Sequence, residues 1–366
     1  MKLFLAILVL VHGFIHFAGF LKGFALKDLK ELTLPISKAF GLAWLGAGIM
    51  VLTFAVLFLL HSRYAWAAGF AALLVSQFLV IWFWKDARPG TIPNLLLLLL
   101  SLASLGKYRF ERMVERETLQ ILGQYKNSSA VSLMEEDLAG LPKPVKNWLK
   151  TCGALGKQRG GYGMIIQAAE LKLKPEQKEW WKANAIQYST LDIPGFIWTV
   201  EVKMNDFIRF RGRDKFEDGK GSMLIKFNSI LNVVNEKGSK LDEGTLQRYL
   251  GEMVWFPSLA LSPFISWEPI NDTTARATMR YKGTEGSGIF SFNSKGEVIR
   301  FSALRFMGNA ADSKRLGWEM NISGWKTFDG IKVPSEMTST WKLDSGDWTW
   351  LKLEVRDIRY HAGAGS

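Results

Sequence analysis

Two histidines near the amino terminus are the first residues whose type and spacing could support chemistry. His12 and His16 lie four residues apart, so a helix would place both imidazoles on one face. At membrane depth such a pair could ligate a metal or a haem, or relay a proton. The alternative is that both rings are neutral and hydrogen-bond a neighbouring helix beside the small residues Gly13 and Gly19. The only other histidine in the first 106 residues, His61, falls in a predicted loop.

A carboxylate and an arginine share one face of a predicted helix in the second half of the chain. The apolar periodicity predicts a helix over Leu241–Leu259 with Asp242 as its N-terminal cap, and Arg248, Glu252 and Trp255 then project at i, i+4 and i+7. Such a pair beside an aromatic ring could act as a general acid/base or bind a polar head group. It is also an ordinary helix ion pair, or a strut between helix and sheet. No second catalytic partner is evident, which favours the strut and leaves no residue assigned to catalysis.

Further candidate ligand contacts come from arginines and tryptophans in predicted strands. Arg211 and Arg213 alternate onto the same face of one strand, where they could pair with a phosphate or a carboxylate. Eleven of the 15 tryptophans follow residue 147, among them Trp198 and Trp267. Aromatic side chains at this density could line the mouth of an apolar cavity, or serve as core and cross-strand pairs.

Several classes of protein are disfavoured by what the sequence lacks. It contains no P-loop, GxSxG, HExxH or Rossmann glycine motif, and the only histidine after residue 106 is His361. A single cysteine, Cys152, excludes an internal disulfide and a CxxC pair. Enzymatic activity is therefore disfavoured, and no cofactor is expected unless a metal or haem binds His12 and His16. The net charge of +12 is spread along the chain, which favours membrane lipids over nucleic acid as partners, with a membrane protein as a further possible partner.

Four apolar stretches in the first 106 residues must hold the histidine pair. They are 18 to 22 residues long, enough to cross about 30 Å of hydrocarbon as helices. The four predicted spans are Leu3–Leu21, Ala39–Leu60, Tyr64–Trp84 and Pro89–Gly106. Six basic residues flank the spans on each side, so charge leaves their orientation open. A helical stalk and collar over 107–158, a β-rich domain over 159–361 and a flexible tail over 362–366 are expected to follow.

The β-rich domain must position the arginines and tryptophans. Its apolar residues alternate with period two between turn signals, which predicts a large curved antiparallel sheet with one packed helix. The turn signals are Asp218-Gly219, Asn293–Gly296, Asp329-Gly330 and Asp344–Gly346. The predicted fold class is thus a four-span α-helical membrane bundle joined to an α+β soluble domain.

Four blocks of aromatic and charged residues follow one another in the second half of the chain: Phe196-Ile-Trp198, Arg211–Gly221, Arg248–Pro257 and Trp267-Glu268-Pro269-Ile270. With these blocks, the chain resembles an uncharacterised bacterial family, domain of unknown function 6544, over residues from about 140 to 360. The resemblance implies no biochemical activity. Similar members carry a single signal-anchor, which implies that the soluble domain lies outside the cytoplasm.

Two fold-level analogies accompany this resemblance. The sheet interrupted by a helix is similar to LolA-type half-barrels, which carry lipoproteins or lipids across the bacterial envelope, and the four-helix part, including Lys85–Asn94, is distantly similar to DoxX-like membrane proteins. The expected function is a binding protein for a lipid or other amphiphilic ligand, multi-pass in the bacterial inner membrane. The alternatives are a membrane oxidoreductase or metal or haem protein using His12 and His16, and a structural or assembly partner of a membrane complex.

Overall fold

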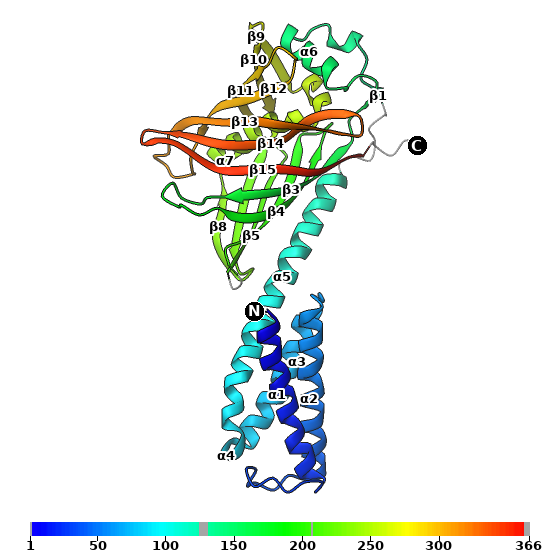
Figure 1. Cartoon of the computed structure of the whole chain (residues 1–366), viewed down its shortest axis with the longest axis vertical. Helices are drawn as coiled ribbons and strands as arrows, with labels where there is room; N and C mark the ends of the chain where they lie inside the picture. The colour runs from blue at the N-terminus through cyan, green and yellow to red at the C-terminus, as the bar shows by residue number, and fades with distance from the viewer. Residues whose placement is uncertain (1, 124–130, 206–207, 362–366) are drawn as a thin grey trace. The chain divides into compact units, whose positions relative to one another are not determined.

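The computed structural model describes residues 2–123, 131–205 and 208–361 (Figure 1). Contacts divide them into one compact unit made mainly of residues 1–113 and a second made mainly of the residues from 114 onward. The predicted flexible tail over 362–366 lies outside the described residues, as do positions 124–130 of the predicted stalk and collar.

The first unit contains four helices long and apolar enough to cross a membrane, as predicted. They are α1 (Lys2–Gly23), α2 (Lys38–Leu59), α3 (Ala65–Trp82) and a last segment made of α4 (Trp84–Ala87), η1 (Arg88–Gly90) and α5 (Thr91–Gly123). α2 begins where the Ser37 hydroxyl accepts the Phe40 N–H, and the turn between α2 and α3 uses a positive φ at His61. The charged extension predicted after the fourth span continues the same helix without a break as far as Gly123.

Small residues allow close packing of α1 against α2. A Cβ at Gly19 would lie 2.3 Å from Cγ of Trp44, and one at Gly48 would lie 2.7 Å from a ring carbon of Phe17. Because lipid offers no hydrophobic drive between helices, such close approach is what holds membrane helices together.

The second unit is a 13-stranded antiparallel sheet built from two meanders (Figure 1). The first meander comprises β3 (Tyr162–Leu171), β4 (Trp181–Thr190), β5 (Gly195–Lys203), β6 (Arg209–Glu217), β7 (Lys220–Phe227) and β8 (Leu231–Lys237). The second comprises β9 (Ile265–Asn271), β10 (Thr274–Tyr281), β11 (Thr284–Phe292), β12 (Val298–Phe306), β13 (Arg315–Phe328), β14 (Ile331–Leu343) and β15 (Gly346–His361). Pairing of β3 with β15 joins them, and β8 and β9 are the two edges, so the sheet is open. The predicted large antiparallel sheet is therefore confirmed.

Shorter elements precede and interrupt the sheet. A two-stranded ribbon of β1 (Val131–Ser132) and β2 (Gln158–Arg159), the turn η2 (Glu136–Leu138) and the helix α6 (Lys143–Thr151) come before it. Between the meanders lie α7 (Ser239–Gly251), η3 (Glu252–Trp255) and η4 (Pro257–Leu261). Helix α6 ends at Thr151, because Gly153 takes a positive φ just after it.

The prediction of one continuous helix over Leu241–Leu259 was wrong. The α-helix ends at Gly251, and two 3₁₀ segments continue the chain to Leu261, because Pro257 cannot donate the backbone hydrogen bond that a helix would need. Asp242 is not the N-terminal cap. It lies within the first turn, where its carboxylate accepts the Gly221 N–H at 2.7 Å and so ties α7 to β7.

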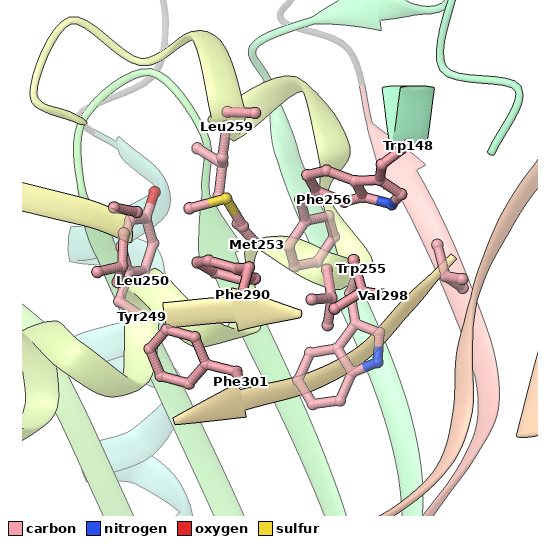
Figure 2. Packing of buried hydrophobic residues seen from close by; sticks show 14 of the residues in the cluster. Trp148, Tyr249, Leu250, Met253, Trp255, Phe256, Leu259, Phe290, Val298 and Phe301 are labelled. Carbon is pink, nitrogen blue, oxygen red and sulfur yellow. The ribbon is translucent and has the colours of Figure 1, made fainter. Parts of the chain in front are cut away.

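One face of the sheet, here called the inner face, carries α7, η3 and η4. α7 packs against β6, β7 and β10–β12. Figure 2 shows the core that results, in which Met253, Trp255 and Phe256 meet Phe290 and Phe301 of the sheet. These side chains are at most 2 % exposed.

The predicted turn at Asp218-Gly219 joins β6 to β7, and the one at Asp329-Gly330 joins β13 to β14. Both residues of each pair have positive φ, which hairpin turns of this length require. Strand β8 was missed because its side chains are polar or exposed and show no buried alternation.

Candidate functional site

Arg248 of α7 is at the centre of a buried charged cluster on the inner face. Its guanidinium donates to Glu252 and to Asp214 at 2.7 Å each, and to the Gln187 side chain at 2.9 Å. Rings of Phe196 and Trp198 lie 4.8 Å from the guanidinium carbon. The arginine therefore links the helix to three strands, β4, β5 and β6.

Strand register explains how the partners of Arg248 meet. Gln187, Trp198 and Asp214 are directly paired across β4, β5 and β6, so their side chains form one row on the inner face. Gln187 also donates to Glu252 at 2.6 Å and to Ser189 at 2.9 Å. We call Gln187, Trp198, Asp214, Arg248 and Glu252 the polar belt.

The polar belt is electrically balanced but desolvated. Asp214 and Glu252 are 6 % and 8 % exposed. Burial alone would lower the pKa of Arg248, but the charges of Glu252 and Asp214 outweigh it and hold that pKa above its ordinary value. Asp214 Oδ1 is buried and, among the described residues, has no hydrogen-bond partner.

A second apolar cluster, which we call the aromatic patch, adjoins the polar belt on the inner face. Its floor consists of small and medium side chains from β3, β4 and β5, all less than 10 % exposed: Ala169, Leu171, Ala183, Ala185, Val200 and Val202. Partly buried side chains pack over this floor: Trp181, Trp198, Phe210, Trp350 and Leu351. Trp181 and Phe210 are stacked, with ring centroids 6.3 Å apart. Trp198 belongs to both the patch and the belt, so the two are continuous.

A tryptophan row crosses the second meander. Trp318, Trp341 and Trp348 are directly paired across β13, β14 and β15. Arg305 of β12 lies over Trp318 at 4.4 Å and over Trp341 at 6.0 Å, and donates to the Gly244 carbonyl at 2.7 Å. Burial, and then the charge of Arg248, lower the pKa of Arg305 to about 10, so it stays protonated at neutral pH.

Arg211 and Arg213 lie on the opposite, outer face. Arg211 donates twice to Glu201, and although burial opposes it, the charges of Arg211 and Arg209 hold the pKa of Glu201 below its ordinary value. Arg213 lies 3.0 Å from Glu117 in the last turns of α5 and donates to Ser222. Both arginines have partners within the protein, and their predicted role as ligand contacts stays a prediction.

Two of the candidate tryptophans lie away from the polar belt. Trp255 is 2 % exposed and donates to the Pro334 carbonyl at 3.1 Å within the core (Figure 2). It does not follow Arg248 at i+7 on one helix, because α7 has ended before it. Trp267 of β9 donates to the Ala260 carbonyl at 2.9 Å and packs on Phe290.

In the first unit, His12 and His16 belong to a buried hydrogen-bonded network. His16 Nδ1 donates to the His12 carbonyl at 2.9 Å, so its Nε2, 2.8 Å from the Ser76 hydroxyl, is the acceptor in the neutral ring. His12 Nε2 lies 2.8 Å from Asn94 Oδ1, and Asn94 donates to Gln77 at 2.9 Å. This geometry is the neutral alternative considered from the sequence.

A metal or haem at these histidines would have to break the hydrogen bonds just described. In residues 2–123, 131–205 and 208–361, no three or more histidine, cysteine, aspartate or glutamate side chains are grouped to hold a metal ion. The metal or haem alternative at His12 and His16 stays a prediction.

Three concave regions accompany these clusters. A groove of about 820 Å³ lies beyond the pair Ile289–Ser302, where β11 and β12 no longer pair with each other. Gln247 bridges this gap by donating to the carbonyls of Ser287 and Leu304. A pocket of about 260 Å³ is lined in part by Lys157, Asp329 and His361. In the first unit, a groove of about 530 Å³ runs along α3 and α5 past Gln77 and Asn94.

Sequence reasoning missed Gln187 and Arg305 as members of these clusters. Each is a polar residue at an inward position of an alternating strand, and Gln187 is fully buried among apolar neighbours. A polar residue that interrupts the apolar phase of a strand is the signal that could have found both.

The chain belongs to a family of unknown function, DUF6544, whose profile matches residues 131–353. This confirms the family resemblance. The match does not extend to the four-helix part, so the DoxX-like analogy stays a prediction. No curated protein matches the chain.

Among solved structures, the chain is similar to a LolA superfamily protein from Nitrosomonas europaea. The alignment has a TM-score of 0.31 and 8 % sequence identity, and covers 62 % of this chain and 91 % of that chain. The fold assignment given above rests on the strand order and the packed helix.

Proposed function

We propose that this protein is a membrane-anchored binding protein for a lipid or another amphiphilic ligand, which lies on the inner face of the sheet. The observation that carries the proposal is the aromatic patch, an apolar floor next to a row of buried polar groups. An amphiphile has the same two parts next to each other, an apolar chain joined to a polar group. The proposal places the chain in the inner membrane of a bacterium, with the soluble domain outside the cytoplasm.

The aromatic patch is covered by side chains and not by a helix, which supports a binding role. α7 packs against β6, β7 and β10–β12, whereas side chains cover the floor formed by β3, β4 and β5. Partly buried rings such as Trp181 and Phe210 can rotate aside with the loss of a few contacts, which for Phe210 include those with Trp181 and Phe227, but a helix would have to move as a whole. The alanines Ala169, Ala183 and Ala185 leave the floor shallow, so a displaced ring makes room for an acyl chain.

Alanine-to-leucine substitutions test the proposal by filling the floor. Native mass spectrometry of the full-length protein, purified in a neutral detergent, should detect bound lipid. Ala169→Leu should reduce the bound fraction at least several-fold, because the added carbons occupy the volume assigned to the chain. The matched control is Ala168→Leu, the adjacent residue of β3, whose side chain points to the outer face.

Two results would reject the proposal. One is a full-length protein that carries no lipid and binds none when lipid is added. The other is equal loss of lipid in Ala168→Leu and Ala169→Leu, which would mean that the inner face is not where the ligand lies.

A second candidate function places chemistry in the membrane bundle. The observation in its favour is that the network of His12 and His16 reaches Asn94 and Gln77, which line the groove of about 530 Å³ along α3 and α5. Polar groups at that depth are accessible to a small lipid-soluble molecule, such as a quinone, or to a metal. An absorbance spectrum and metal analysis of the purified protein test it. A chromophore or stoichiometric metal lost in the double variant His12→Ala/His16→Ala would support it, and neither signal in the intact protein would reject it.

A further inference from the structure

Arg305 differs from the other buried arginines of the soluble domain in having no carboxylate partner in the described chain. Arg248 pairs with Asp214 and Glu252, and Arg213 pairs with Glu117. The contacts of Arg305 are the Gly244 carbonyl and two indole rings. A desolvated cation without a counter-charge is costly, so such a group ordinarily pairs with an anion.

Hydrogen-bond donors without acceptors lie at this arginine and along the tryptophan row. Arg305 Nε is buried and makes no hydrogen bond to a described residue, and the same holds for Nε1 of Trp318, Trp348 and Trp350. Trp318 is in direct contact with Arg305, and Trp348 is two strands from Trp318 in the same cross-strand row. Buried polar groups are ordinarily hydrogen-bonded, so the unpaired donors of Arg305, Trp318 and Trp348 point to a partner that supplies acceptors.

The electrostatics point to the same partner. Burial and the neighbouring charge of Arg248 lower the pKa of Arg305 to about 10. The charges of Asp214, Glu252 and Glu243 raise that pKa, but each of these carboxylates is paired with another arginine, Arg248 or Arg315. An anion between the tryptophans would relieve the repulsion that Arg305 now experiences.

Trp318 also lines the groove of about 820 Å³, which gives the site an opening. The four carboxylates of that groove, on Glu243, Glu268, Glu285 and Glu319, each form an ion pair with an arginine or a lysine. Glu243 does raise the pKa of Arg305, but none of the four forms an ion pair with it among the described residues.

We propose that Arg305, with the indole N–H groups of Trp318 and Trp348, binds the anionic group, phosphate or carboxylate, of the amphiphile whose chain occupies the aromatic patch. This inference rests on the proposed function. It adds that the ligand is anionic and names the residues that bind its charged group. Trp350 belongs to both the donor cluster and the aromatic patch, which joins the two parts of one ligand.

The test uses the full-length protein in a neutral detergent and two lipids with identical dioctanoyl chains, phosphatidylglycerol and dioctanoylglycerol, which has no phosphate and no charge. Native mass spectrometry gives the fraction bound at each concentration. The wild-type protein should bind the anionic probe roughly tenfold or more tightly than the uncharged probe, as expected for hydrogen bonds to a charged group. Arg305→Gln should remove this preference. The matched control Arg300→Gln, an exposed arginine on the same strand, should keep it.

Two further variants keep the inference testable if Arg305→Gln does not fold. Arg305→Lys should retain most of the preference because it retains the charge. Trp318→Phe should lower binding of the anionic probe roughly two- to tenfold by removing one donor, with a smaller change for dioctanoylglycerol.

The outcomes separate this inference from the proposed function. Equal binding of the two probes, or a preference that survives Arg305→Gln, overturns the anion site and leaves lipid binding intact. Binding of neither probe overturns both proposals. Displacement of phosphatidylglycerol by an equal concentration of inorganic phosphate, lost in Arg305→Gln, supports the anion site but overturns its assignment to an amphiphile.

Discussion

Removal of Arg248 should destabilise the soluble domain far more than removal of its whole charged cluster. Arg248→Met eliminates three hydrogen bonds, of 2.7, 2.7 and 2.9 Å, and leaves Asp214 and Glu252 buried without a counter-charge. Deletion of one partner of a buried ion pair costs about 3–5 kcal/mol, mostly because the remaining charge is uncompensated. We therefore expect Arg248→Met to lower the free energy of unfolding of the soluble domain by about that amount.

The triple variant Arg248→Met/Asp214→Asn/Glu252→Gln serves as the comparison. It keeps side chains of nearly the same size but carries no charge, so no buried charge is left uncompensated and the groups left unpaired are neutral amides. The triple variant should consequently recover a large part of the stability lost in the single variant.

Pulse proteolysis in urea measures both variants in the full-length, detergent-solubilised protein, because a short exposure to protease removes only the unfolded fraction. The reasoning is refuted if the triple variant is as unstable as Arg248→Met, or if the single variant behaves like the wild type.

Three further predictions concern the packing and the buried polar groups. Burial raises the pKa of the Cys152 thiol from its usual 9.0 to about 12. The folded state therefore holds a proton that the unfolded state loses above pH 9, and stability should fall between pH 9 and 12, as measured by urea unfolding at each pH. Gly163→Ala should destabilise the domain by about 1–3 kcal/mol or more in the same assay, because a Cβ there would lie 1.9 Å from Cε1 of Phe256. Asn94→Leu should lower the free energy of unfolding of the membrane bundle, measured by thermal unfolding, by about 1–3 kcal/mol, because it removes the 2.8 Å hydrogen bonds that Asn94 Oδ1 makes with His12 and Ser76.

Each of these predictions has a control. Cys152→Ala should abolish the part of the alkaline slope that the thiol causes, and an unchanged slope would contradict the assignment. Gly140→Ala meets no atom within 4 Å and should be close to neutral, so an equal effect at both glycines would contradict the packing argument. Leu95→Val, on an exposed face of α5, should change bundle stability less than Asn94→Leu does.

Local patterns in the sequence predicted the elements well. Uncharged stretches of membrane-spanning length predicted all four apolar helices, and alternation with turn signals predicted most strands. The spacing of Arg248 and Glu252 predicted a shared helix face, and the two residues do form an ion pair at 2.7 Å. Strand alternation predicted that Arg211 and Arg213 point the same way. Each of these relations depends on residues close together in the chain.

Relations between distant segments could not be predicted from one sequence. Asp214 meets Arg248 from 34 positions away, and Arg305 meets Gly244 from 61 positions away, through a register that depends on the order of all the strands between them. His12 meets Asn94 across 82 positions through helix packing. The early end of α7 is different, since Pro257, inside the predicted range, is a local signal for it.

Because β3 pairs with β15, the two meanders can join into one sheet only late in synthesis of this domain. A ribosome delivers the first meander, then α7, then the second meander, and each can begin to form while synthesis continues. In this sheet β15 (Gly346–His361) is the strand that is synthesised last, and until it is made the two half-sheets have four unpaired edges instead of two. A nascent or truncated chain without this strand is therefore at its most prone to aggregate just before it could close, and a chaperone that shields strand edges would act at that stage.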